Sequence, residues 1–155
     1  MELAFVIVTP YTIRKSRTGA VIARLLARTD SELIATQMFA PDAELAEAYA
    51  NTIHPAADPE DEFYRELIRE YIVENLSPDS NGLRRRVLML VFRGEDAQRD
   101  LFRVVGRLRI SCTSGETIRD TYGDLVYNDD GSVRYFEPAV LTSGSPDTVD
   151  DDLRL

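Results

Sequence analysis

The segment Ala139–Asp147, which reads Ala-Val-Leu-Thr-Ser-Gly-Ser-Pro-Asp, is the most informative guide to the architecture of this chain. Its first three residues, Ala139–Leu141, form an apolar run that predicts a short buried strand. Ser145 then starts a helix: serine caps the N-terminus, Pro146 fits the first helical position, and Asp147 favours the positive end of the helix dipole. The segment therefore predicts a last strand, a polar turn and a closing helix.

Apolar runs earlier in the chain predict the strands that join this one in a sheet. They are Leu3–Val8, Leu33–Phe39 and Arg86–Phe92, and the last of them is the strongest central strand. Gly123–Phe136 predicts a β-hairpin, because two β-rich runs flank a turn of asparagine, aspartates and glycine. The hairpin lies directly before the last strand.

Amphipathic stretches between the strands predict helices. They cover Thr18–Ala27, Pro41 to Tyr49, Glu60–Asn75 and the stretch from Asp96 to about Val105. This order predicts one domain, residues 1–155, of the α+β class. We expect a ferredoxin-like βαββαβ plait: a four-stranded antiparallel sheet covered by helices on one face, with the hairpin as an insertion.

Composition and charge exclude several classes of function. The chain has 155 residues, 44% of them apolar, and a formal net charge of −9, which argues against a general nucleic-acid or anionic-membrane binder. No apolar run is long enough to span a membrane. Cys112 is the only cysteine, which fits a passive thiol in a reducing, cytoplasmic compartment. Lys15 is the only lysine, so Schiff-base chemistry is not expected.

Several short motifs follow one another in a fixed order along the chain. They are Phe5–Pro10, Leu45–Tyr49, Phe63–Leu67, Leu88–Gly94, Thr117–Gly123 and Ser145–Thr148. In order and spacing they resemble the motifs of the nucleoside diphosphate kinase family, over nearly the whole chain. The resemblance implies the fold of that family, a cleft for Mg²⁺-nucleotide and assembly into homo-oligomers. It implies no metal site made by protein ligands alone.

The resemblance also implies where the phosphate chemistry of the family would reside. That chemistry passes a phosphoryl group through a phosphohistidine, with charge spread over lysine, arginines, hydroxyls and Mg²⁺. Most of these positions hold apolar or inert residues here: Leu141 for the histidine, Thr9 for the lysine, Pro138 for an asparagine, Phe102 for an arginine and Leu108 for a threonine. Leucine has no lone pair, so the resemblance predicts a site without catalytic residues.

Other positions of the family's site are retained and are candidates for binding a nucleotide. They are Tyr49, Phe63, Arg119 and Ser143, together with Arg103, which adjoins the lost arginine. By resemblance, Arg119 is a phosphate ligand and Phe63 stacks on the base.

Each retained residue also has a structural interpretation. Tyr49 and Phe63 fit the core of two packed helices. Arg119 can pair with Asp120 or Asp152. By resemblance, Asp152 is also a candidate partner of Ser143, in place of the family's glutamate.

Three hypotheses follow. The first is a nucleoside diphosphate kinase-like protein without phosphotransfer activity that self-associates as a scaffold, with the hairpin Leu125–Tyr135 offering an edge to another chain. The second is a nucleotide-binding sensor that keeps Tyr49, Phe63 and Arg119. The third is an active kinase that uses His54, the only histidine, as the phosphate acceptor. An exposed loop histidine without function is the simpler interpretation of His54.

Overall fold

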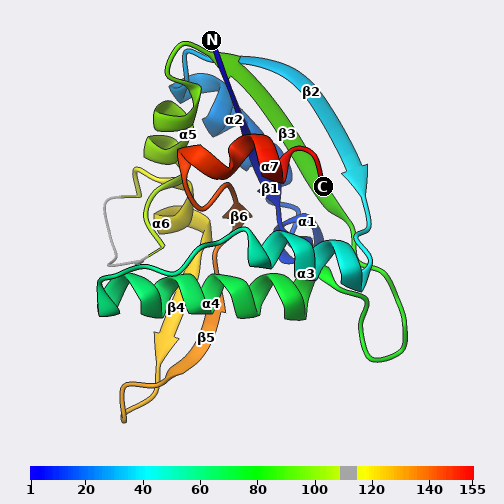
Figure 1. The fold of residues 1–155 in the computed structure, drawn as a ribbon, viewed down its shortest axis with the longest axis vertical. Helices are drawn as coiled ribbons and strands as arrows, with labels where there is room; N and C mark the ends of the chain where they lie inside the picture. The colour runs from blue at the N-terminus through cyan, green and yellow to red at the C-terminus, as the bar shows by residue number, and fades with distance from the viewer. Residues whose placement is uncertain (109–114) are drawn as a thin grey trace.

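The computed structural model describes residues 1–108 and 115–155. Its centre is a four-stranded antiparallel sheet with the strand order β2-β3-β1-β6 (Figure 1). The strands are β1 (Glu2–Val8), β2 (Glu32–Phe39), β3 (Val87–Gly94) and β6 (Val140–Leu141). This confirms the predicted α+β plait. Cys112 lies outside the described residues.

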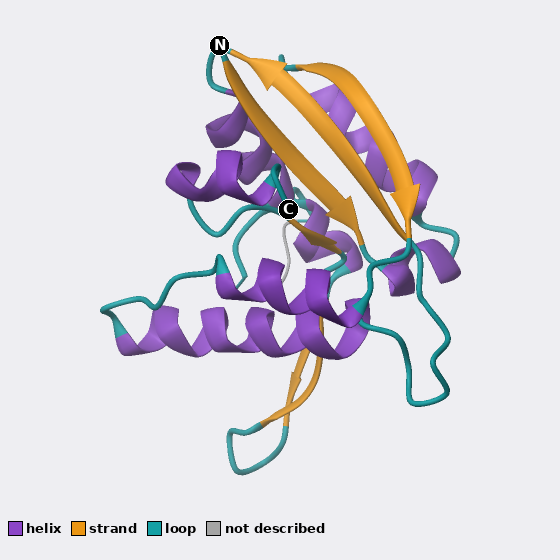
Figure 2. Cartoon of the chain, turned by 45° about the vertical axis from the view of Figure 1, so that its right-hand side comes forward, coloured by secondary structure: helices purple, strands orange, loops and turns teal. Residues whose placement is uncertain are grey.

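Helices cover both faces of the sheet (Figures 1 and 2). One face packs against α2 (Thr18–Arg28) and α5 (Ala97–Val105). The other packs against α3 (Ala43–Asn51), α4 (Pro59–Leu76) and α7 (Val149–Asp152). The expectation that helices cover one face only is therefore wrong.

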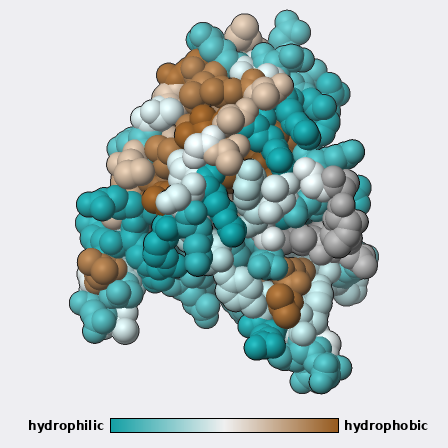
Figure 3. Space-filling view, turned by 180° about the vertical axis from the view of Figure 1, so that it is seen from behind, coloured by the Kyte–Doolittle hydropathy of each residue, from teal (hydrophilic) through white to brown (hydrophobic). Residues whose placement is uncertain are grey.

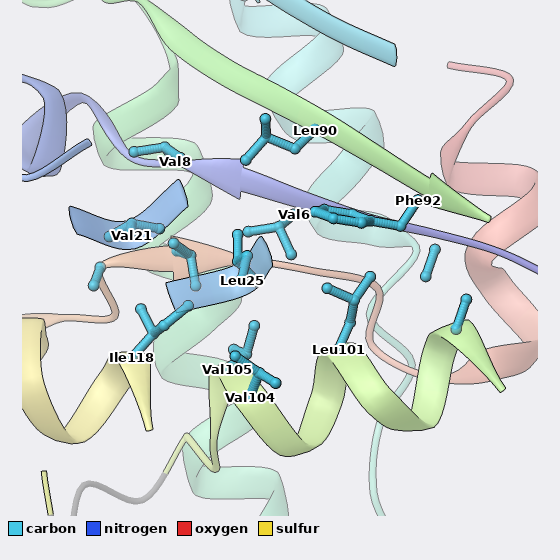
Figure 4. Packing of buried hydrophobic residues seen from close by; sticks show 14 residues of the cluster. Val6, Val8, Val21, Leu25, Leu90, Phe92, Leu101, Val104, Val105 and Ile118 are labelled. Carbon is cyan, nitrogen blue, oxygen red and sulfur yellow. The ribbon is translucent and has the colours of Figure 1, made fainter. Parts of the chain in front are cut away.

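The sequence of β1 explains why both faces are covered. Successive side chains of a strand point to opposite faces. Val6 and Val8 belong to the core layer beneath α2 and α5, which Figure 4 shows, whereas Phe5 and Ile7 belong to the layer beneath α3 and α4. A continuous apolar run, rather than an alternating one, is what a strand buried on both faces requires.

The predicted hairpin is present and forms a separate sheet. Among the described residues, strands β4 (Asp124–Tyr127) and β5 (Val133–Glu137) pair only with each other, and they project away from the body (Figures 1 and 2). Gly131 adopts a φ of 84° in the turn, which suits glycine. The hairpin contacts α4 through several side chains: the hydroxyls of Tyr64 and Tyr127 lie 3.2 Å apart, the Tyr71 and Phe136 rings meet edge to face, and the Tyr71 hydroxyl donates to Glu137.

Two short helices were not predicted from the sequence. They are α1 (Pro10–Arg14) and α6 (Ile118–Tyr122). Each begins at a threonine whose hydroxyl accepts a hydrogen bond from the amide three residues later: Thr9 from Thr12, and Thr117 from Asp120. Five residues are too few to show a helical period, so only these capping residues signal the helices.

The closing helix starts where the sequence predicts but is short. A 3₁₀ turn, η1 (Pro146–Thr148), leads into α7. The carbonyl of Ser145 accepts hydrogen bonds from both the amide and the hydroxyl of Thr148. Within the described parts of the chain, no helix is long and apolar enough to cross a membrane.

Candidate functional site

A cleft of about 420 Å³ lies beside the segment that follows β6. Its walls come from the first half of α4, the end of α5, the start of α6 and the turn Thr142–Gly144. The lining residues are Ile53, Glu60, Asp61, Tyr64, Arg65, Ile68, Phe102, Arg107, Leu108, Arg119, Leu141, Thr142, Ser143 and Gly144. The cleft thus collects charged, aromatic and aliphatic side chains from segments that are distant in sequence.

Leu141 forms an aliphatic part of the cleft wall. It is only 1% exposed and belongs to the core layer that contains Phe5 and Ile7. In the sheet it pairs with Ile7 of β1. Phe102 and Leu108, two more of the apolar replacements noted in the sequence, also line the cleft. They narrow it without filling it, because a cavity remains between them.

Arg119 is a buried cation at the edge of this cavity. It is 3% exposed, and its two terminal nitrogens donate to the carbonyls of Gly106 at 3.1 Å and Val140 at 3.0 Å. The third donor, Nε, has no hydrogen-bond partner among the residues that the structure describes. Burial lowers the pKa of Arg119 to about 10, so the guanidinium is still charged at neutral pH. The terminal nitrogens of Arg119 therefore donate to backbone carbonyls, and not to the carboxylates of Asp120 or Asp152 that the sequence suggests as partners.

Ser143 and Asp152 lie together, as the resemblance implies. The Ser143 hydroxyl is 2.8 Å from an Asp152 carboxylate oxygen and 2.7 Å from the Thr148 hydroxyl. Burial raises the pKa of Asp152, while hydrogen bonds to its carboxylate oppose that shift. The Ser143 side chain is thus fixed at the wall of the cleft by α7 and the turn before it.

Tyr49 and Phe63 occupy different environments. Tyr49 is a core residue whose hydroxyl donates to the Thr142 carbonyl at 2.8 Å, and burial raises its pKa far above the usual range. Phe63 is 41% exposed, so the core interpretation is wrong for this residue. Its ring packs edge-on against Tyr64, and Tyr64 is the aromatic residue of α4 that lines the cleft.

The remaining candidates lie outside the cleft lining. Arg103 sits 3.8 Å from the Asp100 carboxylate and donates to the Arg28 carbonyl. His54 is exposed, and its carbonyl accepts a hydrogen bond from Arg65. Thr9 is fully buried in a separate polar cluster. Pro138 lies between that cluster and β6.

Sequence reasoning missed three of the polar cleft residues, Tyr64, Arg65 and Arg107. A signal for the first two was available: Asp61, Tyr64, Arg65 and Ile68 recur at spacings of three and four along α4, which places them on one face of the helix. Arg107 had no such signal, because it lies beyond the last residue of α5 and takes part in no helical period.

The polar cluster around Thr9 was also missed. Its centre is Glu137, which is 3% exposed. One carboxylate oxygen accepts from the Thr9 hydroxyl and from the Ala139 amide, both at 2.9 Å, and the other accepts from the Tyr71 hydroxyl. The Thr12 hydroxyl donates to the Ala139 carbonyl at 2.8 Å. This network ties the base of the hairpin to α1, α4 and the entry to β6.

The amino-acid sequence matches no family model and no curated protein. Solved structures do match, each over 99% of this chain. The nucleoside diphosphate kinase from Pyrobaculum aerophilum has a TM-score of 0.71 at 17% identity, with 93% of its own chain covered. The Borrelia burgdorferi enzyme with bound vanadate and ADP has a TM-score of 0.69 at 17% identity and 84% coverage.

A third similar structure is the Aquifex aeolicus nucleoside diphosphate kinase, with a TM-score of 0.65, 22% identity and 92% of its chain covered. At identities this low, the similarity shows that the backbone fold is shared. The chemistry of the site has to be argued from its own residues. From end to end, this chain has the fold of the nucleoside diphosphate kinases.

Proposed function

We propose that this chain is a nucleoside diphosphate kinase-like module that does not transfer phosphate and acts through self-association. The observation that supports this most directly is Leu141, an aliphatic side chain at the position where the family resemblance puts the phosphate acceptor. Among the described residues that line the cleft there is no histidine, lysine or cysteine. Removing a single preorganised donor commonly costs about 10²–10³ in rate, and here the nucleophile is missing as well.

Incubation with γ-labelled ATP and GDP is expected to give neither labelled protein nor labelled GTP. An active nucleoside diphosphate kinase serves as the positive control, and the His54→Ala variant tests the one alternative acceptor. Since His54 lies outside the cleft lining, wild type and variant should be equally unlabelled. Labelling of the wild type that His54→Ala abolishes would instead establish the kinase hypothesis.

Self-association is supported by the open edge of the sheet. In the part of the chain that the structure describes, β2 pairs with β3 on one side and has no strand on the other, and most of its eight residues are exposed. Met38 is 51% exposed on the face that α2 covers, and Leu26 of α2 is half-exposed. Figure 3 shows a hydrophobic area over the upper part of this side of the molecule, where β2 and α2 lie. An unpaired apolar edge of this kind favours pairing with another chain.

The Met38→Glu variant is expected to shift the protein from dimer or larger species to monomer, because a charge at the edge disfavours strand pairing. Size-exclusion chromatography with light scattering measures the change. Val126→Glu tests the hairpin edge, and Leu83→Glu is the matched control on an exposed turn. A wild-type protein that is monomeric at high concentration would rule out the self-association part of the proposal.

A second candidate function is binding of a phosphate-bearing ligand, such as a nucleotide, without turnover. Arg119 favours it, since a buried guanidinium with an unpaired Nε is costly unless a ligand satisfies it. Arg65, Arg107 and the Ser143 hydroxyl line the same cavity, and Tyr64 offers a ring for a base. Here Mg²⁺ would arrive with the nucleotide.

Calorimetric titration with ADP, with and without Mg²⁺, tests this candidate. We expect Arg107→Gln to weaken any binding about tenfold, because a charge-assisted hydrogen bond is lost. Arg107 is exposed, so the variant should fold normally. Arg103→Gln, outside the cleft, is the matched control. Absence of heat and of a thermal shift at millimolar nucleotide would eliminate the second candidate.

A further inference from the structure

A second cavity lies where the hairpin joins the body, and none of its described lining residues also lines the cleft. Its volume is about 260 Å³. The walls come from α1, the second half of α4, the loop before β3 and the base of β5 (Figure 1). The hairpin insertion therefore creates this cavity, because β5 supplies one of its walls.

Aromatic rings form much of the wall. Tyr11 of α1 and Tyr135 of β5 meet edge to face, with ring centroids 6.5 Å apart. Tyr71 of α4 and Phe136 of β5 meet in the same way at 5.9 Å. All four rings line the cavity. Rings held in edge-to-face pairs provide a preformed surface on which a further planar ring can pack.

Two arginines from distant parts of the chain also line the cavity, Arg14 at the end of α1 and Arg85 before β3. Nε and one terminal nitrogen of Arg85 donate to the carbonyls of Glu74 and Ser77, which holds the guanidinium in place. Arg14 is exposed and makes no side-chain hydrogen bond or ion pair within residues 1–108 and 115–155. Cations that already lie beside Tyr11, Lys15 at 5.6 Å and Arg17 at 5.8 Å, add positive charge nearby.

Among the described lining residues, the one acidic side chain, Glu137, already has hydrogen-bond donors within the protein. Both oxygens of Glu137 accept hydrogen bonds from within the protein. Burial raises the pKa of Glu137, while hydrogen bonds to its carboxylate and the charge of Arg14 oppose that shift. In a chain with a net charge of −9, this cavity is thus a local concentration of positive charge.

We propose that this cavity binds a small aromatic anion, a planar ring that carries a carboxylate or a phosphate. The rings of Tyr11 and Tyr135 contact the ring of the ligand, and the guanidinium groups of Arg14 and Arg85 pair with its charge. The cavity lies just below the usual size range of drug-binding pockets, which suits a ligand of about one ring. This site is independent of the cleft and of phosphate transfer.

Ligand-observed NMR titrations with four probes test the proposal: benzoate, phenyl phosphate, inorganic phosphate and benzyl alcohol. Benzoate and phenyl phosphate separate the two possible anionic groups. Inorganic phosphate carries the charge but lacks the ring, and benzyl alcohol has the ring but lacks the charge. We expect at least one aromatic anion to bind more tightly than both of the latter probes.

Variants locate the binding. Arg14→Gln is expected to weaken the aromatic anion about tenfold, since it removes a charge-assisted hydrogen bond at an exposed position. Arg134→Gln, an equal loss of charge at an exposed β5 residue outside the cavity, should leave binding unchanged. The proposal is overturned if neither aromatic anion binds at millimolar concentration, if benzyl alcohol or inorganic phosphate binds equally well, or if Arg134→Gln weakens binding as much as Arg14→Gln.

Discussion

The Glu137→Ala variant is expected to be less stable than the wild type by about 3–5 kcal/mol. The substitution leaves the Tyr71 hydroxyl and the Ala139 amide without their acceptor in the interior, whereas the Thr9 hydroxyl keeps the Thr12 hydroxyl at 3.0 Å. Each buried polar group without a partner costs about 1–3 kcal/mol. Chemical denaturation followed by circular dichroism measures the difference in the free energy of unfolding.

Two variants separate the loss of hydrogen bonds from the loss of volume. Glu137→Gln keeps the size of the side chain and one carbonyl acceptor, so its cost should be about 1–2 kcal/mol. Tyr71→Phe removes a single donor to the same carboxylate and should cost about 1 kcal/mol. If Glu137→Ala were as stable as Glu137→Gln, the network would not contribute as described.

The same residue predicts a pH dependence with a definite sign. Because burial raises the pKa of Glu137, the folded protein keeps this proton to a higher pH than the unfolded chain does. The corresponding stability is fully present below the unfolded pKa and is lost as the pH rises through the folded pKa. The stability of the wild type relative to Glu137→Gln should therefore decrease from mildly acidic to neutral pH. A constant difference would contradict the raised pKa.

The Gly106→Ala variant is expected to lose about 3–4 kcal/mol of stability, for two separate reasons. Gly106 has a φ of 91° and a ψ of 175°, a conformation that side chains rarely allow. An added Cβ would also lie 2.4 Å from the Thr117 hydroxyl, which caps α6 and cannot move without losing that bond. Since the Gly106 carbonyl accepts from Arg119, any shift here also disturbs the cleft.

Gly131→Ala is the matched control for this prediction. Gly131 also has a positive φ, of 84°, but a Cβ added at this position in the hairpin turn would have no other atom within 4 Å. This variant should therefore cost only about 1 kcal/mol, from backbone strain alone. Thermal unfolding of both variants gives the comparison, and equal losses would mean that the contact with Thr117 has no effect.

The central elements could be predicted from the sequence because their patterns are strong. The apolar runs of β1 and β3 and the helical spacing in α4 define their elements closely. The second covered face was missed, although the continuous apolar run Leu3–Val8 is the pattern of a strand buried on both faces. The short helices α1 and α6 depend on threonine caps and tertiary contacts. Neither leaves a helical repeat of apolar residues in the sequence.

The candidate site was only partly predictable. The pairing of Ser143 with Asp152 follows from the motif, because both lie in the compact closing segment. Tyr64, rather than the expected Phe63, lines the cleft because of the rotation of α4 about its own axis. Adjacent residues of a helix point in directions about 100° apart, so a small error in the expected rotation selects the wrong one. Glu137 was missed for another reason. Two of its three hydrogen-bond donors, Thr9 and Tyr71, are distant in sequence, so the residues around Glu137 do not indicate that it is buried.

The two edges of the main sheet differ, and this bears on how far assembly can proceed. One edge is the long strand β2, and the other is β6, which has only two residues. If two copies pair through β2 about a twofold axis, each of them uses its long edge. The ends of the joined sheet are then both β6, which are too short to accept another chain. Such a contact closes on itself, so the expected product is a finite particle rather than a fibre.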